Sequence, residues 1–93
     1  DLGVWAKDGN AFINIKQVEE NGVLKGISVF EFDNDLRLMH KMTASSAHFE
    51  NSGWQMQQVN LNRWKVKNIE HEYFDSLPWP TSKTRENATV RFT

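Results

Sequence analysis

Three histidines are the residues whose chemistry matters first, because histidine is a common metal ligand and general base. His40 and His48 stand eight residues apart on one predicted strand, which separates them by roughly 26 Å at about 3.3 Å per residue. His71 stands between two glutamates that strand alternation places on the opposite face. The chain has no cysteine and no H-x-x-x-H spacing. We therefore expect solvated histidines and no metal site.

Two polar clusters could be read as catalytic or calcium-binding sites. Asp33-Asn34-Asp35 resembles the start of a calcium loop but lacks the glycine and the final glutamate of such a loop, so it is interpreted as a hairpin turn. Ser45, Ser46 and His48 could complete a nucleophilic triad with an aspartate, but no nucleophile-elbow sequence is present. We expect no catalytic residue, no cofactor and no enzymatic activity.

Basic residues alternate with apolar ones near the middle of the second half of the chain. Arg63, Lys65 and Lys67 share one strand face, with Trp64 and Val66 on the other. The stripe fits either phosphate binding or a solvated face backed by a core. The net charge of the whole chain is −1, so the solvated face is favoured and no nucleic-acid partner is expected.

Composition indicates one soluble-type domain over residues 1–93. The chain is 39% hydrophobic and 25% charged, which is ordinary for a globular domain, and 12% aromatic. No apolar run is long enough to span a bilayer, and no signal peptide is visible. Both ends look cut, so we expect an extramembrane domain excised from a larger protein.

Turn signals and period-two alternation predict an all-β fold. Asp8-Gly9-Asn10, Glu19–Gly22, Asp33–Asp35 and Glu50–Gly53 are turn sequences. No segment has a sustained helical pattern. Segment 77–81 holds two prolines and is excluded from a central strand. The predicted strands cover residues 3–8, 11–18, 23–32, 36–49, 54–59, 61–69 and 85–92, which indicates an antiparallel sandwich or open barrel.

The hairpin over residues 36–59 changes parity along its length. Its apolar residues switch faces near Ala44–Ser46 and again after Met56. One extra residue, a β-bulge, would reconcile the two halves and bend the hairpin between two layers. In the preceding strand, alternation places Ile27 and Val29 opposite Leu24, Phe30 and Phe32, and Gly26 indicates a bulge or a close backbone approach.

The abundance of large apolar side chains leaves two interpretations open. Aromatic residues and three methionines alternate in ways that expose apolar groups on both faces of a small sheet. Methionine and aromatic side chains suit an irregular apolar ligand such as an acyl chain. The plainer interpretation, favoured by composition alone, is a full core with a few contacts to neighbouring chains.

Several segments in order resemble the periplasmic domain of the LptF/LptG permease family. They are Gly3–Asn10 with its W-x-x-D-G pattern, Ile13–Val18, the L-x-G-I-S-V-F-x-F run of Leu24–Phe32, and Leu36–Val59. The last contains a T-A-x-x-A-x-F…G-W-x-M hairpin, with Ala44, Ala47, Phe49 and Trp54, that is closer to the LptG branch. The similarity is concentrated in residues 3–60.

This resemblance implies a β-jellyroll of the LptA/LptC type, in the periplasm, between two membrane helices of an inner-membrane subunit. The subunit would belong to an ATP-binding-cassette exporter of lipopolysaccharide, with the partner LptF/LptG permease, the LptB ATPase and the LptC and LptA jellyrolls as partners. The domain would pass or guide lipid A acyl chains towards the periplasmic bridge; the alternative is a structural or protein-interaction jellyroll that carries no lipid. The candidate groove residues are Ile13, Ile15, Ile27, Val29, Phe30, Phe32, Leu38, Met42, Trp54 and Met56.

Overall fold

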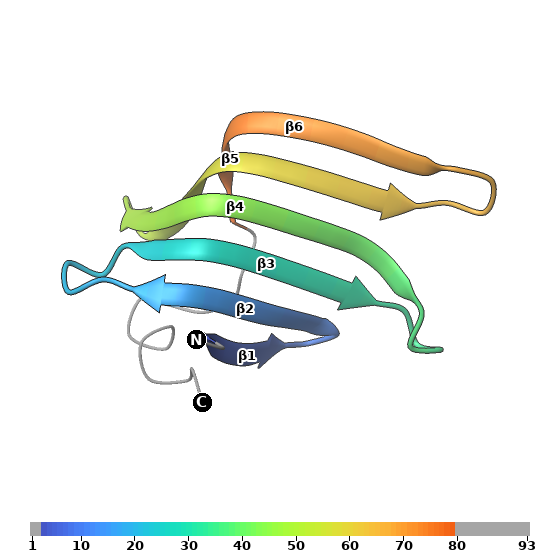
Figure 1. Cartoon of the computed structure of the whole chain (residues 1–93), viewed down its shortest axis with the longest axis horizontal. Helices are drawn as coiled ribbons and strands as arrows, with labels where there is room; N and C mark the ends of the chain where they lie inside the picture. Colours follow the sequence, from blue (N-terminus) through green and yellow to red (C-terminus); the bar gives the residue numbers. More distant parts are fainter. Residues whose placement is uncertain (1–2, 80–93) are drawn as a thin grey trace.

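The computed structural model describes residues 3–79, which form one antiparallel sheet of six strands in chain order (Figure 1). The sheet is open and curved. The described part contains no helix, so the predicted all-β, jellyroll-like class is confirmed. The strands are β1 Val4–Asp8, β2 Ala11–Val18, β3 Leu24–Phe32, β4 Leu38–Glu50, β5 Gly53–Trp64 and β6 Ile69–Pro78.

All four predicted turns are present, with one correction. In the β4–β5 turn the two residues with positive φ are Asn51 and Ser52 (52° and 68°), while Gly53 begins β5 and pairs with Glu50. A two-residue hairpin with both central residues at positive φ has the twist that adjacent strands require. Glycine therefore ends this turn instead of supplying its positive φ.

The predicted strand 61–69 is wrong. Strand β5 runs without interruption to Trp64. Residues 65–68 form a turn that is closed by a hydrogen bond of 2.8 Å from the Lys65 amide to the Asn68 carbonyl. This turn contains neither glycine nor proline, so the usual sequence signal is absent. Segment 70–74 belongs to β6, an edge strand whose last residue is Pro78. The predicted strand 85–92 lies outside the described residues.

Pairing across all six strands arranges the residues in rows that run across the sheet. Successive rows point to opposite faces of the sheet. The row of Val4, Ile15, Ile27, Ala44, Val59 and Phe74 is apolar throughout and faces the core. The next rows on either side face outward, because successive residues of a strand point to opposite faces. We call the two sides the core face and the outer face.

The alternation reverses along one line across the sheet, which we call the crease. One residue of each strand from β2 to β6 lies on it: Lys16, Gly26, Ser45, Gln58 and Asp75. The residues before and after each of these positions pair with the neighbouring strand in the same register. Gly26 and Gln58 have positive φ values of 66° and 54°. The predicted parity changes near Ser45 and after Met56 are thus confirmed.

The physical cause differs from the predicted bulge. Each strand inserts one residue at the same place, so no strand slips past its neighbour, and the recorded register shift of the β3–β4 pair lies between Glu31 and Phe32. A further consequence is that Leu24 is fully buried on the core face together with Ile27. The prediction that placed Leu24 opposite Ile27 is wrong, because Gly26 at positive φ reverses the alternation between them.

Candidate binding groove

The core face has two ends, separated by the crease. Beyond the crease, the filled end is closed by side chains with almost no exposure: Leu24, Ala47, Met56 and Trp54, at 0–3%. Phe49 meets the Trp54 ring edge-on at 5.4 Å, and Trp79 meets it at 6.3 Å. The Trp79 amide also donates to the Trp54 carbonyl at 2.9 Å. Aromatic packing therefore buries the Trp54 ring at this end, and a hollow of about 200 Å³ remains beside Phe49, His48 and the turn at residues 21–23.

The other end, which we call the open end, is hollow. One hollow of about 280 Å³ lies over β3 to β6 and is lined mainly by Val29, Met42, Leu61 and Leu77. A second, of about 270 Å³, lies over β1 to β4, where Asp8, Ala11, Ile13 and Trp79 line it. Val29, Met42 and Glu31 line both, so the two hollows adjoin. Their volumes lie near the lower bound of typical ligand sites, about 300 Å³.

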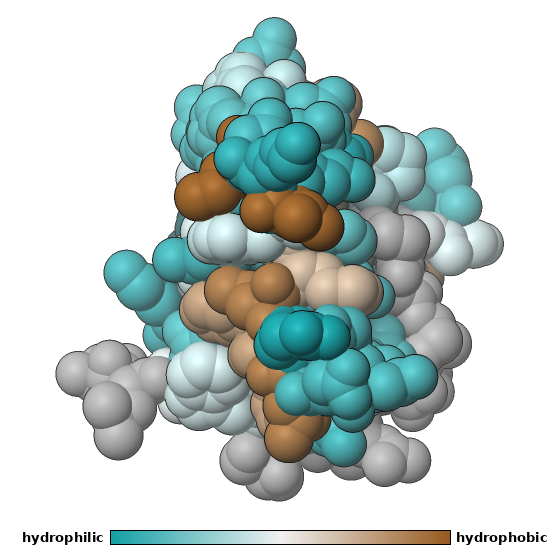
Figure 2. All heavy atoms as spheres, turned by 90° about the vertical axis from the view of Figure 1, so that its right-hand side faces the viewer, coloured by the Kyte–Doolittle hydropathy of each residue, from teal (hydrophilic) through white to brown (hydrophobic). Residues whose placement is uncertain are grey.

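A row of polar residues borders the open end. This rim row, paired strand by strand, consists of Asp8, Ala11, Glu31, His40, Arg63 and Glu70. His40 Nδ1 lies 3.4 Å from Glu31 Oε1, and Arg63 forms an ion pair with Glu72. Figure 2 looks onto this end and shows apolar surface in a broken band between hydrophilic flanks. The groove is therefore apolar inside and charged where it meets water.

The structure brings together seven of the ten predicted groove residues. Ile13, Ile15, Ile27, Val29, Trp54 and Met56 belong to the buried core, and Met42 packs against it. Of these, Ile13, Val29 and Met42 border the hollows; Ile15, Ile27, Trp54 and Met56 are at most 3% exposed and are packed by protein.

The other three predicted residues lie elsewhere. Phe30 and Phe32 point to the outer face, where they line a separate apolar depression with Trp5 and Phe12. Leu38 pairs with Phe32 at the register shift and lines neither hollow. Alternation with Val29 already places Phe30 and Phe32 on the opposite face, but the sequence alone does not tell which of the two faces is hollow.

Sequence reasoning missed Leu61, Ala11, Trp79 and the rim row. Leu61 has the parity of Val59, and this signal was hidden by the wrong break between two strands. Trp79, the residue directly after β6, lines the second hollow, which strand alternation does not predict. Ala11 carries no signal by itself, since a small side chain lines a hollow only when larger neighbours surround it.

The residues considered first for catalysis or metal binding have separate partners. His48 contacts Glu50 at 2.6 Å and His71 contacts the Asn62 amide oxygen at 2.6 Å, while His40 contacts Glu31. Within residues 3–79 no three histidine or acidic side chains are grouped as a metal would require.

Asp33 has the predicted turn role. Its carboxylate accepts hydrogen bonds from the backbone amides of Arg37 and Asp35, at 2.9 and 2.8 Å. The Arg37 amide, then the Asp35 amide and the Arg37 guanidinium, hold the pKa of Asp33 below its ordinary value, against a smaller opposing effect of desolvation. The carboxylate thus stabilises its own loop.

The predicted basic stripe is divided by the turn. Arg63 lies in β5 on the rim row, whereas Lys65 and Lys67 lie in the turn that follows. Trp64 is 38% exposed and Val66 is fully exposed. The prediction that Trp64 and Val66 form a core behind the stripe is therefore wrong.

Comparisons with known proteins place these features in context. The family described as lipopolysaccharide export system permease LptF/LptG matches residues 1–93. The chain is 40% identical over 91 residues to the lipopolysaccharide export system permease protein LptG of Escherichia coli, strains K12 and CFT073, and covers 25% of each. It is 34% identical over 85 residues to LptG of Haemophilus influenzae, of which it covers 24%.

These matches extend the similarity beyond residues 3–60. The Escherichia coli alignment includes 95% of this chain, so the C-terminal third resembles the family too. The chain spans about a quarter of the length of the curated relatives that it matches. Among residues 3–79, there is no helix of the length and apolarity needed to cross a membrane.

Proposed function

Because the chain belongs to the LptF/LptG family of lipopolysaccharide export permeases, closer to LptG, we propose that its core face guides lipid A acyl chains during export. The family is one of transporters rather than enzymes. In this proposal residues 1–93 form a single periplasmic domain of the inner-membrane subunit. The domain passes acyl chains towards the periplasmic bridge and catalyses no reaction itself.

The open end of the core face is the observation that carries this proposal. Val29, Met42, Leu61 and Leu77 line a space that no described side chain fills. Each methylene removed from water contributes about 0.8 kcal/mol, so an apolar hollow is a favourable place for an acyl chain. A fully packed core face would offer no such place.

The shape of the groove suits passage better than tight binding. It is open to one end and bordered by charged residues, and Met42 is a flexible side chain that adapts to irregular apolar partners. A groove that held the chain too strongly would slow its release. Export of this kind needs shielding from water and no chemical step, and its energy would come from the LptB ATPase acting through the membrane part.

The second candidate function is a structural or docking domain that carries no lipid. It is favoured by the exposure of β6, an edge strand of ten residues whose side chains are mostly accessible. An edge strand can accept a strand from another sheet. Under this alternative the neighbours would be the partner permease subunit and the LptC and LptA jellyrolls, and lipopolysaccharide would pass through the partner subunit.

Photocrosslinking to lipopolysaccharide during ATP-driven export tests the proposal. A photoreactive amino acid at Met42 faces the hollow, whereas one at Thr43 faces outward from the next position of the same strand. We expect lipid adducts at Met42 and none at Thr43. Ser76 provides a second control, since it is exposed on β6 beyond the crease, away from the hollow.

Two results would argue against lipid passage here. Adducts in the partner permease with none at Met42 would favour the docking function. Equal adducts at Met42 and Thr43 would mean that lipid reaches this domain from outside and does not use the groove.

A further inference from the structure

We propose that the outer face of β1–β3 docks on the surface of an anionic phospholipid bilayer. This role is separate from the groove, because the residues concerned point away from the core face. It therefore stands or falls independently of lipid passage.

An aromatic patch lies on this face. Trp5, Phe12, Phe30 and Phe32 line an open depression that contains no polar surface. Trp5 stacks on Phe30 at 6.3 Å, and Phe12 meets Phe32 edge-on at 5.8 Å. Trp5 is 47% exposed and Phe12 is 40% exposed. Four neighbouring rings that remain accessible in a small domain indicate a surface with a partner.

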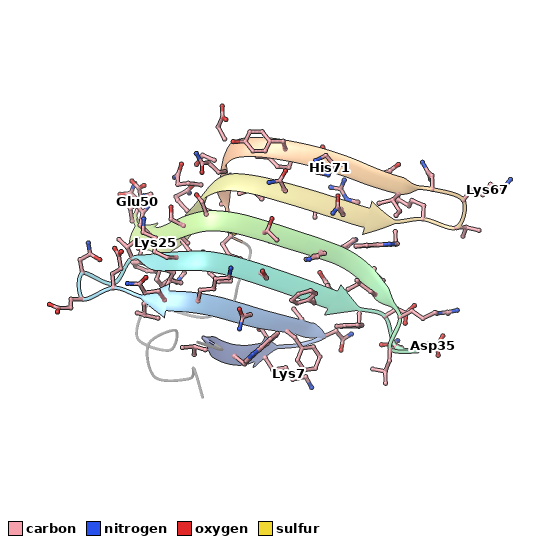
Figure 3. The ribbon with its side chains drawn as sticks, viewed as in Figure 1. Lys7, Lys25, Asp35, Glu50, Lys67 and His71 are labelled. Carbon is pink, nitrogen blue, oxygen red and sulfur yellow. The ribbon has the colours of Figure 1, made fainter. Side chains whose placement is uncertain are left out.

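Two lysines flank the rings. Lys7 Nζ lies 5.6 Å from the centre of the Phe12 ring, and Lys41 Nζ lies 5.4 Å from that of Phe30. Both ammonium groups are thus held beside the aromatic surface by cation–π attraction. Figure 3 looks onto this face and shows Lys7 extending from β1 at the edge of the sheet.

The acidic side chains of these strands point the other way, and Asp33 and Asp35, in the turn after Phe32, both pair with Arg37. Asp8, Glu31 and Glu70 lie in the rim row, and Glu72 lies one row further along the core face. The two outer rows between them and the crease contain no carboxylate. These rows consist of Lys7, Phe12, Phe30, Lys41, Asn62 and His71, then Trp5, Asn14, Ser28, Thr43, Asn60 and Tyr73.

This combination fits a lipid surface better than a protein. The cores of protein interfaces are depleted in lysine, but here lysines sit directly on the rings. Tryptophan and other amphipathic side chains concentrate at the boundary of a bilayer. Basic residues beside them are attracted to anionic lipids. Because the family is a permease, a bilayer lies within reach of the domain.

Fluorescence quenching in the full-length permease tests this docking. The protein, freed of cysteines, is reconstituted into nanodiscs of phosphatidylglycerol and phosphatidylcholine that contain a lipid with a nitroxide on its headgroup. A bimane label is placed by Ser28→Cys, beside Phe30, or by Ser76→Cys. Ser76 is exposed on β6 beyond the crease, so it is a matched serine far from the patch.

We expect the label at position 28 to be quenched and the label at position 76 to be unaffected. Lys7→Gln combined with Lys41→Gln should lower the ratio of docked to undocked protein by about twenty-five-fold, since each lysine near an anionic bilayer contributes about fivefold. Nanodiscs of phosphatidylcholine alone should have a similar effect.

Equal quenching at both positions, or quenching that ignores lipid charge and both lysines, would overturn the proposal. A label at position 28 that is shielded from lipid until the partner subunit is removed would also overturn it, and would assign the patch to a protein contact. Serine-to-cysteine changes alter little volume, so both labelled proteins should fold.

Discussion

The two ends of the core face share strands β2 to β6 and the same apolar alternation, yet one is filled and the other, which alone includes β1, is hollow. At the filled end, Trp54 and Met56 are at most 3% exposed, and Trp79 and Phe49 pack on the tryptophan ring. At the open end, the corresponding rows carry Ala6, Ala11 and the flexible Met42, and hollows remain. The two ends thus differ in the size of their side chains and in β1, which only the open end has.

This contrast shows how a small domain can combine stability with an open groove. The large rings buried at one end stabilise the fold, so the other end can remain hollow. The crease divides the two ends without breaking a strand, because β2 to β6 all change parity at the same place. Substitutions at matched positions on the two ends test whether the division of roles is real.

Truncation at the filled end should have the largest effect. Trp54→Ala removes a buried ring and its contacts with Phe49 and Trp79, and we expect a loss of about 3–5 kcal/mol in the free energy of unfolding. Urea denaturation of the 93-residue chain, followed by circular dichroism, measures it. Trp64→Ala is the control. Because Trp64 is 38% exposed, this substitution should lower the free energy of unfolding by less than about 1 kcal/mol. Similar losses for both would contradict the contrast.

Two methionines compare the ends directly. Met56 is fully buried at the filled end, so Met56→Ala should cost about 2–5 kcal/mol. Met42 already borders both hollows, and Met42→Ala should cost only about 1–2 kcal/mol because its side chain is partly exposed. The same denaturation experiment measures both variants. A larger loss at Met42 would mean that the open end is packed in solution.

The crease predicts a gain in stability. Gln58 has a φ of 54°, a conformation that costs a non-glycine residue about 1 kcal/mol. Gln58→Gly should therefore raise the free energy of unfolding by roughly 0.5–1 kcal/mol. The neighbouring Gln57→Gly, in an ordinary strand conformation, should lower it by roughly 0.5–1 kcal/mol. Opposite signs for adjacent glutamines would support the crease; equal losses would refute it.

The smallest effect concerns the turn beside the open end. The lowered pKa of Asp33 means that its charged form is favoured in the folded protein. The carboxylate therefore contributes to stability at pH values above 3.8, its ordinary pKa. That contribution should fade as the pH falls below this value and the carboxylate is protonated. Asp33→Ala should lower the thermal midpoint at pH 7 and differ less from the unchanged protein in strong acid. Thermal melts over a pH series measure this, and a constant difference at all pH values would contradict it.

Strand positions were largely predictable because alternation and turn residues are local signals. The β2 range was predicted fully and β1, β3 and β4 to within about two residues, as expected for strand ends. The break in β5 was misplaced because the turn after Trp64 has no glycine or proline. Parity slips near Ser45 and Gln58 could be seen in each strand, but only pairing shows that they align as a crease.

The groove was less predictable, because a face is hollow only when side chains from several strands leave space together. Alternation separated Val29 from Phe30 correctly, yet both were taken as groove residues. Trp54 and Met56 were also predicted to line a groove, but Phe49 and Trp79 close that end. Contacts between residues distant in sequence decide such cases, and no local pattern contains them.

By itself the sequence determined the all-β class, most of the strands, the turn at Asp33 and the resemblance to one permease family, since these depend on local residue order. The tertiary structure alone decided the alignment of the parity changes into a crease, the contrast between a filled and an open end, and the separation of a carboxylate-bearing rim from a lysine-flanked aromatic face. The physical reason is that packing and charge separation depend on which rows of residues share a face, and only pairing between strands sets those rows.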